Sequence, residues 1–479
     1  MSLSIAKLEF SRELYLEHCD EISFLYETRG DDLISDKLQW PELQDDEGRI
    51  DAHLDALLIG GQAALDNILD LCNEGDASAY YITTCLYCRN ANIRGLFQFF
   101  AKLESDTLLV TPDTLNAVKD ALLQEWPESW FAALANYPFQ QFPKLVSVFV
   151  PLYGNRRQPL AEKLFSLAIK EGLLPGSYHL KAARQLNNCQ ALPKDYWKLT
   201  KKEQSHSIQE KVLCLLQLTQ TERTSYIKKL LDFFQKQFPE HKIPYTVFSI
   251  AADKPLARQI CSLDEELTLA RVLAIGMTGL PEDIPLLLSY LNNEAVAPTA
   301  ALALQIITGA DMMTEQFRPE TWGEAELFDD ELADFKQGKA PQHPEGRPYG
   351  QREIALSSNP NDWQAWVQHY GDNFQPGLRY RFGYPMSPRT LVYTLSHPAA
   401  SRLIRYLSHE ELLRRYDSDS SCANIPFNTD DWVHKQYSAI YQLSQWADNV
   451  EQHFEPGGWY LNGHPISPDL ASDPPPSVK

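Results

Sequence analysis

The sequence predicts an all-α protein, namely a HEAT-like α-solenoid of stacked helix pairs followed by a smaller, mostly helical C-terminal domain. Three observations support this fold class. Apolar residues recur at helical spacing in paired runs, glycine and proline separate the runs, and residues 50–312 contain almost no alternating strand pattern. Stacked pairs bury their apolar stripes against neighbouring pairs, so a chain of 479 residues needs no single large core. The alternative is a set of ordinary helical hairpins in globular domains.

Residues 267–309 show the pattern most clearly. Two runs at i, i+3, i+4 spacing indicate two helices. The runs are Leu269, Val272, Leu273 and Met277, and then Ile284, Leu287, Leu288 and Leu291. Gly279 is predicted to end the first helix and Pro281 to open the second. A third helix is expected from Pro298 to Gly309, and a similar helix–glycine–helix layout surrounds Gly61.

Composition divides the chain into five predicted segments. They are an acidic helical cap at residues 1–50, the HEAT-like repeat domain at 51–312, an acidic linker containing Pro and Gly at 313–350, an aromatic-rich helical domain at 351–465, and a disordered tail at 466–479. Within the aromatic-rich domain, helices are expected near 388–396, 399–416 and 430–448. Ser387 and Pro388 are suited to the N-cap and first position of the first of these.

The charge and cysteine content restrict the classes of partner. The formal net charge is −21, and phosphate binding requires clustered Lys and Arg, so nucleic acid is not expected as a partner. A basic protein partner is compatible with this charge, although solubility explains the charge equally well. We expect no membrane partner, because no apolar run approaches the length of a bilayer span. Eight cysteines without regular spacing or a secretory signal predict reduced thiols and a cytoplasmic protein.

No catalytic, metal or cofactor site is predicted. Cys85 and Cys88 form the one CxxC motif, but they lie on a helical apolar stripe and have no second ligand pair, which favours core packing over zinc. The HExxH-like stretch that begins at His409 has Leu413 where the second histidine is required. Ser225 and Lys228 match an SxxK spacing that arises easily by chance. The sequence therefore favours a non-enzymatic protein that binds neither metal nor cofactor.

Arginines alternate with aromatic residues in one local cluster. It comprises Arg379, Tyr380, Arg381, Phe382 and Tyr384. Arg and Tyr are enriched at interface hot spots, so Arg379, Tyr380, Arg381 and Tyr384 are candidate partner-binding residues. The alternative, which the sequence favours, is an internal staple. In that arrangement the arginines pair with carboxylates of the acidic linker, and the aromatic rings fill the small C-terminal core.

Four segments resemble those of a known family. They are Ser23–Arg29 (SFLYETR), Ile50–Gly60 (IDAHLDALLIG), Gly377–Gly383 (GLRYRFG) and Pro426–Trp432 (PFNTDDW). In these segments the chain resembles a family of uncharacterised bacterial HEAT-like repeat proteins associated with type VI secretion gene clusters. Members of that family tend to be encoded near genes for PAAR-like spike tips, adaptors and thiolase-like proteins. The resemblance implies a cytoplasmic accessory role in loading secreted effectors, and none of the segments is a catalytic motif.

The first functional hypothesis is a non-enzymatic protein-binding scaffold. It would act as an adaptor or chaperone for type VI secretion effector loading, and its partner would be a secreted effector, a PAAR-like spike tip or an adaptor. One alternative is an immunity-type protein that neutralises a basic toxin. A less favoured alternative is a HEAT-repeat enzyme such as a bilin lyase or a DNA glycosylase. The glycosylase requires a basic groove, which the acidic composition disfavours.

Overall fold

The computed structural model describes residues 5–35, 38–105, 107–134, 143–155, 164, 166, 170, 205–218, 231–234, 236, 244–261, 267–320, 322–323 and 327–466. The described chain is mostly helical and its few strands are short, which confirms the predicted helical class. The solenoid arrangement stays a prediction. Contacts divide the chain into two compact units, residues 1–259 with 386–479 and residues 260–385.

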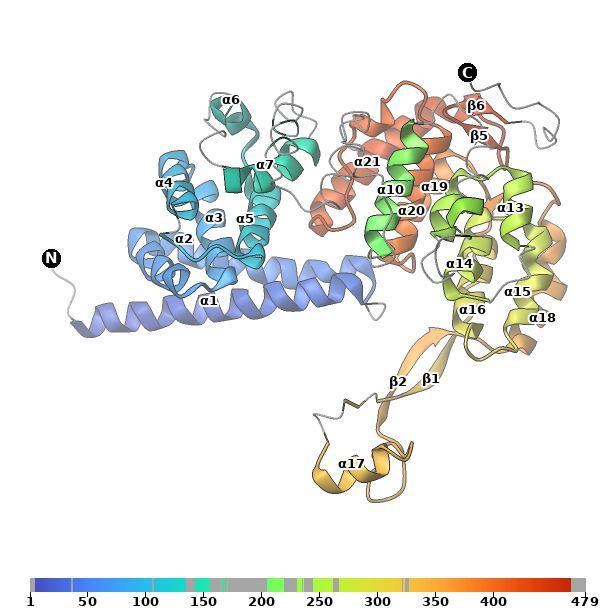
Figure 1. Ribbon diagram of the computed structural model, residues 1–479, viewed down its shortest axis with the longest axis horizontal. Helices are drawn as coiled ribbons and strands as arrows, with labels where there is room; N and C mark the ends of the chain where they lie inside the picture. Colours follow the sequence, from blue (N-terminus) through green and yellow to red (C-terminus); the bar gives the residue numbers. More distant parts are fainter. Residues whose placement is uncertain are drawn as a thin grey trace. The chain divides into compact units, whose positions relative to one another are not determined.

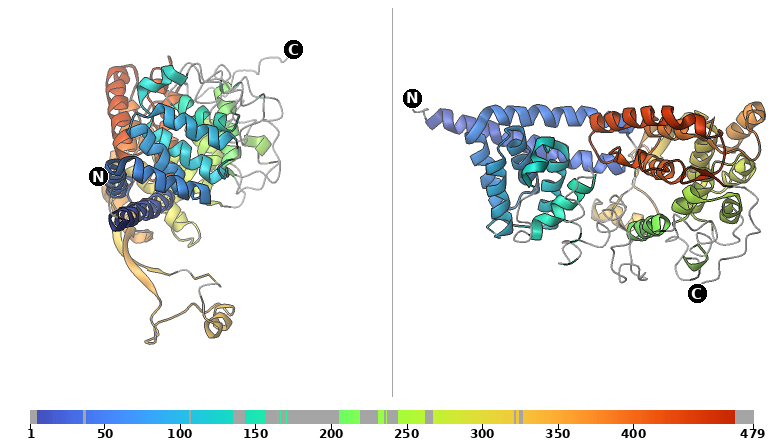
Figure 2. Two further views of the ribbon diagram at one scale, coloured as in Figure 1. Left: turned by 90° about the vertical axis from the view of Figure 1, so that its left-hand side faces the viewer. Right: turned by 90° about the horizontal axis from the view of Figure 1, so that it is seen from above.

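Two long antiparallel helices begin the first unit. Helix α1 spans Ile5–Ile34 and α2 spans Leu43–Glu74, with the short 3-10 helix η1 (Trp40–Glu42) before α2. Figure 2 shows α1 and α2 lying side by side, and Ile22 of α1 and Leu54 of α2 belong to one buried cluster. Gly61 bends α2 with φ 60° and ψ −138°, a conformation that a residue with a side chain rarely adopts. The predicted helix–glycine–helix layout is therefore one kinked helix.

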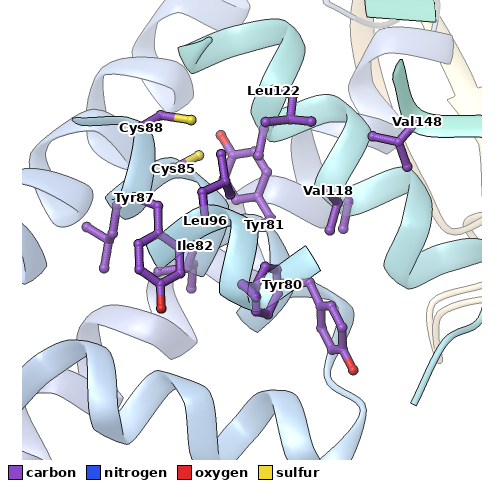
Figure 3. Close-up of a cluster of buried hydrophobic side chains, with 14 of the residues drawn as sticks. Tyr80, Tyr81, Ile82, Cys85, Tyr87, Cys88, Leu96, Val118, Leu122 and Val148 are labelled. Atoms are coloured by element: carbon purple, nitrogen blue, oxygen red, sulfur yellow. The ribbon is translucent and has the colours of Figure 1, made fainter. Parts of the chain in front are cut away.

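Five further helices and one 3-10 helix follow α2 in the first unit. They are α3 (Ala77–Arg89), α4 (Ile93–Glu104), α5 (Pro112–Glu125), η2 (Glu128–Trp130), α6 (Phe131–Leu134) and α7 (Pro143–Asn155). Nearly all of α3 is buried, and Cys85 and Cys88 lie in its core beside Tyr81 and Leu122 (Figure 3). The predicted core packing of these two cysteines is confirmed.

The first unit is completed by helices from the middle and the end of the chain. These elements are α10 (Ser205–Leu218), α12 (Tyr245–Ala251), α13 (Lys254–Cys261), α19 (Pro388–Ser396), α20 (Arg402–Arg415), η10 (Cys422–Asn424), α21 (Val433–Val450), η11 (Glu451–His453), β5 (Tyr460–Leu461) and β6 (His464–Pro465). The division between the units falls within α13. A second core joins Leu391, Leu412 and Leu443 of α19, α20 and α21.

Helices α19, α20 and α21 agree with the three helices predicted in this region to within a few residues. The hydroxyl of Ser387 accepts a hydrogen bond from the backbone N–H of Thr390, and Pro388 is the first residue of α19. Both roles match the sequence prediction, because a proline needs no N–H donor in the first helical turn.

The second unit contains a helical core and a β-ribbon. Its elements are α14 (Leu269–Thr278), η7 (Pro281–Asp283), α15 (Ile284–Tyr290), α16 (Ala297–Thr308), β1 (Met313–Pro319), α17 (Asp329–Phe335), β2 (Gly350–Leu356), α18 (Pro360–Tyr370), η9 (Gly371–Asn373), β3 (Tyr380–Arg381) and β4 (Tyr384–Pro385). Helix α14 packs against α16, and α15 packs against α16 and α18. A Cβ on Gly276 would lie 2.6 Å from the Cα of Ala303, so this glycine permits the close approach of α14 and α16.

The helix ends predicted for residues 267–309 are confirmed, but the predicted apolar face needs two corrections. Gly279 and Gly309 end α14 and α16 in the left-handed conformation. Leu269 is exposed, because it is the first residue of α14 and lies at the edge of the packed helices. Leu287 is fully buried whereas Leu288 is half-buried, so the core-facing direction of α15 is centred on Leu287.

The structure divides the chain differently from the predicted segments. The boundary at residue 50 lies inside α2, which packs with α1 into one core. The predicted linker at 313–350 contains β1 and α17, and β1 pairs with β2. Residues 351–385 belong to the same unit as residues 260–312, while residues 386–466 belong to the first unit. The predicted tail, apart from Ile466, lies outside the described residues, as do Ser225 and Lys228.

Candidate protein-binding surfaces

The arginine and tyrosine cluster predicted as a partner-binding site lies on the β3–β4 hairpin. Arg379 and Arg381 are fully buried, and Tyr380 is also buried. Arg379 Nε donates to the carbonyl of Thr278 at 2.8 Å, and Arg381 Nη2 donates to the carbonyl of Met277 at 2.8 Å. Both guanidinium groups therefore supply donors to backbone carbonyls at the C-terminal end of α14, where a helix lacks intrahelical donors.

Only one of the four predicted residues presents a large exposed surface. Tyr384 is 56% exposed. Tyr380 uses its hydroxyl to accept a hydrogen bond from the backbone N–H of Gln375, and its ring packs edge-on to Phe374. The burial expected of an internal staple is observed for Arg379, Tyr380 and Arg381, but the contacts described above join the arginines to backbone carbonyls of α14, whereas the prediction named carboxylates of the linker. Partner binding through this cluster stays a prediction. Of the four residues, Tyr384 is the one exposed enough to contact a partner directly.

The same hairpin motif occurs a second time in the chain. Residues 374–388 read FQPGLRYRFGYPMSP, and residues 454–468 read FEPGGWYLNGHPISP. In the second copy the hydroxyl of Tyr460 accepts from the backbone N–H of Glu455, and its ring packs edge-on to Phe454. Sequence reasoning considered only the first copy, although the shared Phe, Pro, Gly, Tyr and Ser positions were available to find the second.

Both hairpins cap the C-terminal end of a helix. Phe382 and Asn462 have positive φ values and precede a glycine with positive φ, the two-residue turn that suits a β-hairpin. The backbone N–H groups of Phe382 and Gly383 donate to Ile306 and Ile307 at the end of α16, and those of Asn462 and Gly463 donate to Arg414 and Arg415 at the end of α20. The duplicated motif therefore serves fold assembly in both units.

The β1–β2 ribbon has a different character, because most of its side chains are exposed. Its strands are antiparallel, with Glu315 opposite Ile354 and Phe317 opposite Arg352. Opposed residues share a face, and alternate residues point to opposite faces. One face, called the apolar face below, therefore carries Met313, Phe317 and Ile354, which are 45%, 47% and 74% exposed, together with the exposed ion pair of Glu315 and Arg352. Figure 1 shows the ribbon extending from the helices of the second unit toward α17.

Both faces of the ribbon carry an exposed ion pair, but the second face has no large apolar side chain. The opposite face carries Thr314, Gln316 and Arg318, together with Gln351 and Glu353 of the paired strand. Arg318 forms an exposed ion pair with Glu353 at 3.3 Å. The base of the ribbon is fixed by backbone and side-chain contacts, since the N–H of Ser357 donates to the carbonyl of Met312 and Trp363 Nε1 donates to the carbonyl of Ser357. An anchored ribbon thus presents an apolar face to solvent.

The connection between the ribbon strands is acidic and exposes an aromatic ring. Residues 320–334 contain seven acidic residues and no Lys or Arg. Phe328, immediately before α17, is 76% exposed. Met313 and Phe317 share a face of β1, but Glu315 lies between them, so the stretch lacks the strict apolar alternation that predicts a strand.

A second exposed apolar surface lies on α1. Phe10 and Phe24 are 66% and 63% exposed, and Leu14 is 38% exposed. Other side chains of the helix, including Cys19, Ile22 and Leu25, are buried in the first core. Exposed acidic residues surround the outer side chains. Helix α1 therefore presents both apolar and acidic groups to solvent.

Neither a metal-binding group nor reactive Cys72 and Cys85 thiols are found in the described residues. Among them, no group of three or more His, Cys, Asp or Glu side chains is placed to hold a metal ion. Burial raises the pKa of the Cys72 thiol to about 12 and raises the pKa of the Cys85 thiol well above its usual range. Such thiols carry little thiolate at neutral pH and are poor nucleophiles. No helix in the described ranges is both long and apolar enough to span a bilayer.

Comparisons with known proteins identify no relative of this chain. No family model, no curated protein and no solved structure matches it.

Proposed function

We propose that this chain is a non-enzymatic protein-binding scaffold, and that it acts as an adaptor or chaperone accessory to type VI secretion effector loading. The observation that supports protein binding is the exposed apolar face of the β1–β2 ribbon. The connection to type VI secretion rests on the sequence resemblance alone. The proposed partner is a secreted effector, a PAAR-like spike tip or another adaptor.

The proposal rests on the free energy that is lost while the apolar side chains of the ribbon remain exposed to water. A two-stranded hairpin is marginally stable in water unless its apolar face packs against another surface. Seven residues per strand give a ribbon about 23 Å long. Burying Phe317 and Ile354 against a partner would contribute about 1.5–3 kcal/mol for each side chain that becomes fully buried. The open strand edges would also supply backbone hydrogen bonds to an added strand.

The charge of the chain supports a basic partner. The net charge of −21 and the acidic ribbon connection would attract a positively charged polypeptide and increase its association rate at low salt. We therefore expect the association rate constant to fall as ionic strength increases. Apolar contacts at the ribbon face would then determine how long the complex lasts.

The test compares ribbon variants during affinity purification of the full chain from its native cells. Phe317→Ser combined with Ile354→Ser removes the apolar face, whereas Thr314→Ser combined with Gln351→Ser changes the polar face as a matched control. We expect mass spectrometry to find a protein that co-purifies with the original chain and the control, and that is lost from the apolar-face variant. Equal recovery from both variants would contradict the proposal.

The same purified partner separates effector loading from immunity. A loading adaptor is expected to be needed for secretion of its partner and to leave cell survival unchanged when the partner is expressed. An immunity protein would instead protect cells from killing by that partner. A survival assay with and without this chain, alongside a secretion assay, distinguishes the two roles.

A further inference from the structure

Helix α1 carries three exposed apolar side chains along one line. Leu14 follows Phe10 by four residues and Phe24 follows it by fourteen, which places all three within about 40° of one line along the helix at 3.6 residues per turn. The line from Phe10 to Phe24 is about 21 Å long at 1.5 Å per residue. These side chains are exposed in the described structure, so the line is available to a partner.

Carboxylates lie on the line and beside it. Glu17 and Glu21 project within about 20° of Phe10, between Leu14 and Phe24, and Glu13 projects about 60° from it. All three are exposed. Arg12, the exposed basic residue of this stretch, projects about 160° from Phe10, on the far side of the helix. Glu21 contacts Arg49 of α2 at 3.4 Å, an exposed pair that salt screens readily.

The charge identifies the kind of partner that fits. A second copy of α1 would bring the same carboxylates against one another, and an anionic membrane surface would be repelled by them. A helix with apolar residues on one side and Lys or Arg beside them would bury Phe10, Leu14 and Phe24 while pairing with Glu13, Glu17 and Glu21. Amphipathic helices commonly dock in this way, with apolar anchors spaced by one helical turn.

We propose that the outer side of α1 is a docking site for a basic amphipathic helix of a partner protein. The inference deepens the proposed function by naming the chemistry of a bound segment, and it uses a surface separate from the β1–β2 ribbon. The apolar line supplies the contact area, and the carboxylates select a basic segment over an acidic one.

The test uses the full chain and a fluorescent synthetic peptide of about 18 residues, with leucines at i, i+3, i+4 and i+7 and lysines elsewhere. We expect saturable binding by fluorescence anisotropy. Phe10→Ser combined with Phe24→Ser should weaken binding by about tenfold or more, which corresponds to about 1.4 kcal/mol. Ile34→Ser is the matched control, because Ile34 is 73% exposed on the same helix but lies off the line.

A charge series completes the design. Replacing Glu13, Glu17 and Glu21 with glutamine should reduce the salt dependence of binding, and a peptide with glutamates in place of the lysines should not bind. The proposal is overturned if the basic peptide does not bind, if the phenylalanine variant binds as well as the control, or if Phe10 and Phe24 instead mediate self-association in sedimentation experiments. Retained peptide binding in the Phe317→Ser, Ile354→Ser variant separates this site from the ribbon, so either proposal can fail alone.

Discussion

Buried arginines complete the ends of two helices through their guanidinium groups. Arg379 and Arg381 supply donors to the end of α14, and Arg415 supplies donors to the carbonyls of Ser249 and Ala252 at the end of α12. Arg415 also pairs with Glu411 at 2.6 Å, and both side chains are fully buried. A helix end without intrahelical donors is satisfied in each case by a charged group with several N–H donors.

At the residue scale, we predict that Arg415→Met destabilises the protein by about 3–5 kcal/mol, because it leaves Glu411 buried without this partner. Arg389→Met is the control, since Arg389 pairs with Asp448 at the surface and an exposed pair contributes at most about 1 kcal/mol. Chemical denaturation followed by circular dichroism measures both. Equal midpoints for the two variants would show that the buried pair contributes no more than the exposed one.

At the residue scale, the burial of a side chain was more predictable from the sequence than its hydrogen-bond partners. The burial of Cys85 and Cys88 was predictable because they fall on an apolar stripe. The contacts of Arg379 and Arg381 with α14 were not predictable, because they join residues about one hundred positions apart. Every residue has a backbone carbonyl that can accept a hydrogen bond, so the sequence does not show which carbonyls receive these donors.

At the element scale, α15 tests the observed helix register. Leu287→Ala should reduce stability by about 2–5 kcal/mol, because Leu287 is fully buried. Leu288→Ala should cost less, since the half-buried side chain of Leu288 leaves a smaller cavity. Comparing the denaturation midpoints of the two variants measures the difference. A larger loss for Leu288→Ala than for Leu287→Ala would contradict the observed register.

We predict that a histidine pair between α1 and α2 makes the stability of the protein depend on pH. His18 Nδ1 and His53 Nδ1 lie 2.8 Å apart, with Glu21 and Arg49 nearby. Burial, and then the neighbouring His18, lowers the pKa of His53 below its usual 6.5. As pH falls through 6.5 the unfolded chain takes up the proton first, so this contribution to stability is present above that pH and is lost below it.

The expected outcome is a fall in unfolding free energy from about pH 7.5 to about pH 5.5 that is smaller in His53→Gln. Denaturant titrations at both pH values measure it, and His343→Gln, which alters an exposed histidine of the other unit, controls for general effects. An unchanged pH dependence in His53→Gln would exclude this histidine pair as its source.

At the scale of the whole molecule, local signals predicted helices more successfully than they predicted domain organisation. Helices α14, α16, α19, α20 and α21 follow apolar periodicity and capping residues that are adjacent in sequence. The division into units depends on contacts between distant segments, such as α12 with α20, and no local pattern specifies such pairs. The sequence predicts a linker in place of the ribbon, because the two strands are separated by an acidic segment containing Pro and Gly.

The most direct test of the scaffold proposal places a photo-crosslinking amino acid on the β1–β2 ribbon in native cells. Replacing Ile354 puts the crosslinker on the apolar face, and replacing Gln351 puts it on the polar face of the same strand. The proposal predicts a discrete crosslinked adduct with one other polypeptide from position 354 and little or none from position 351. No adduct from either position, or equal adducts from both, would contradict protein binding through this face.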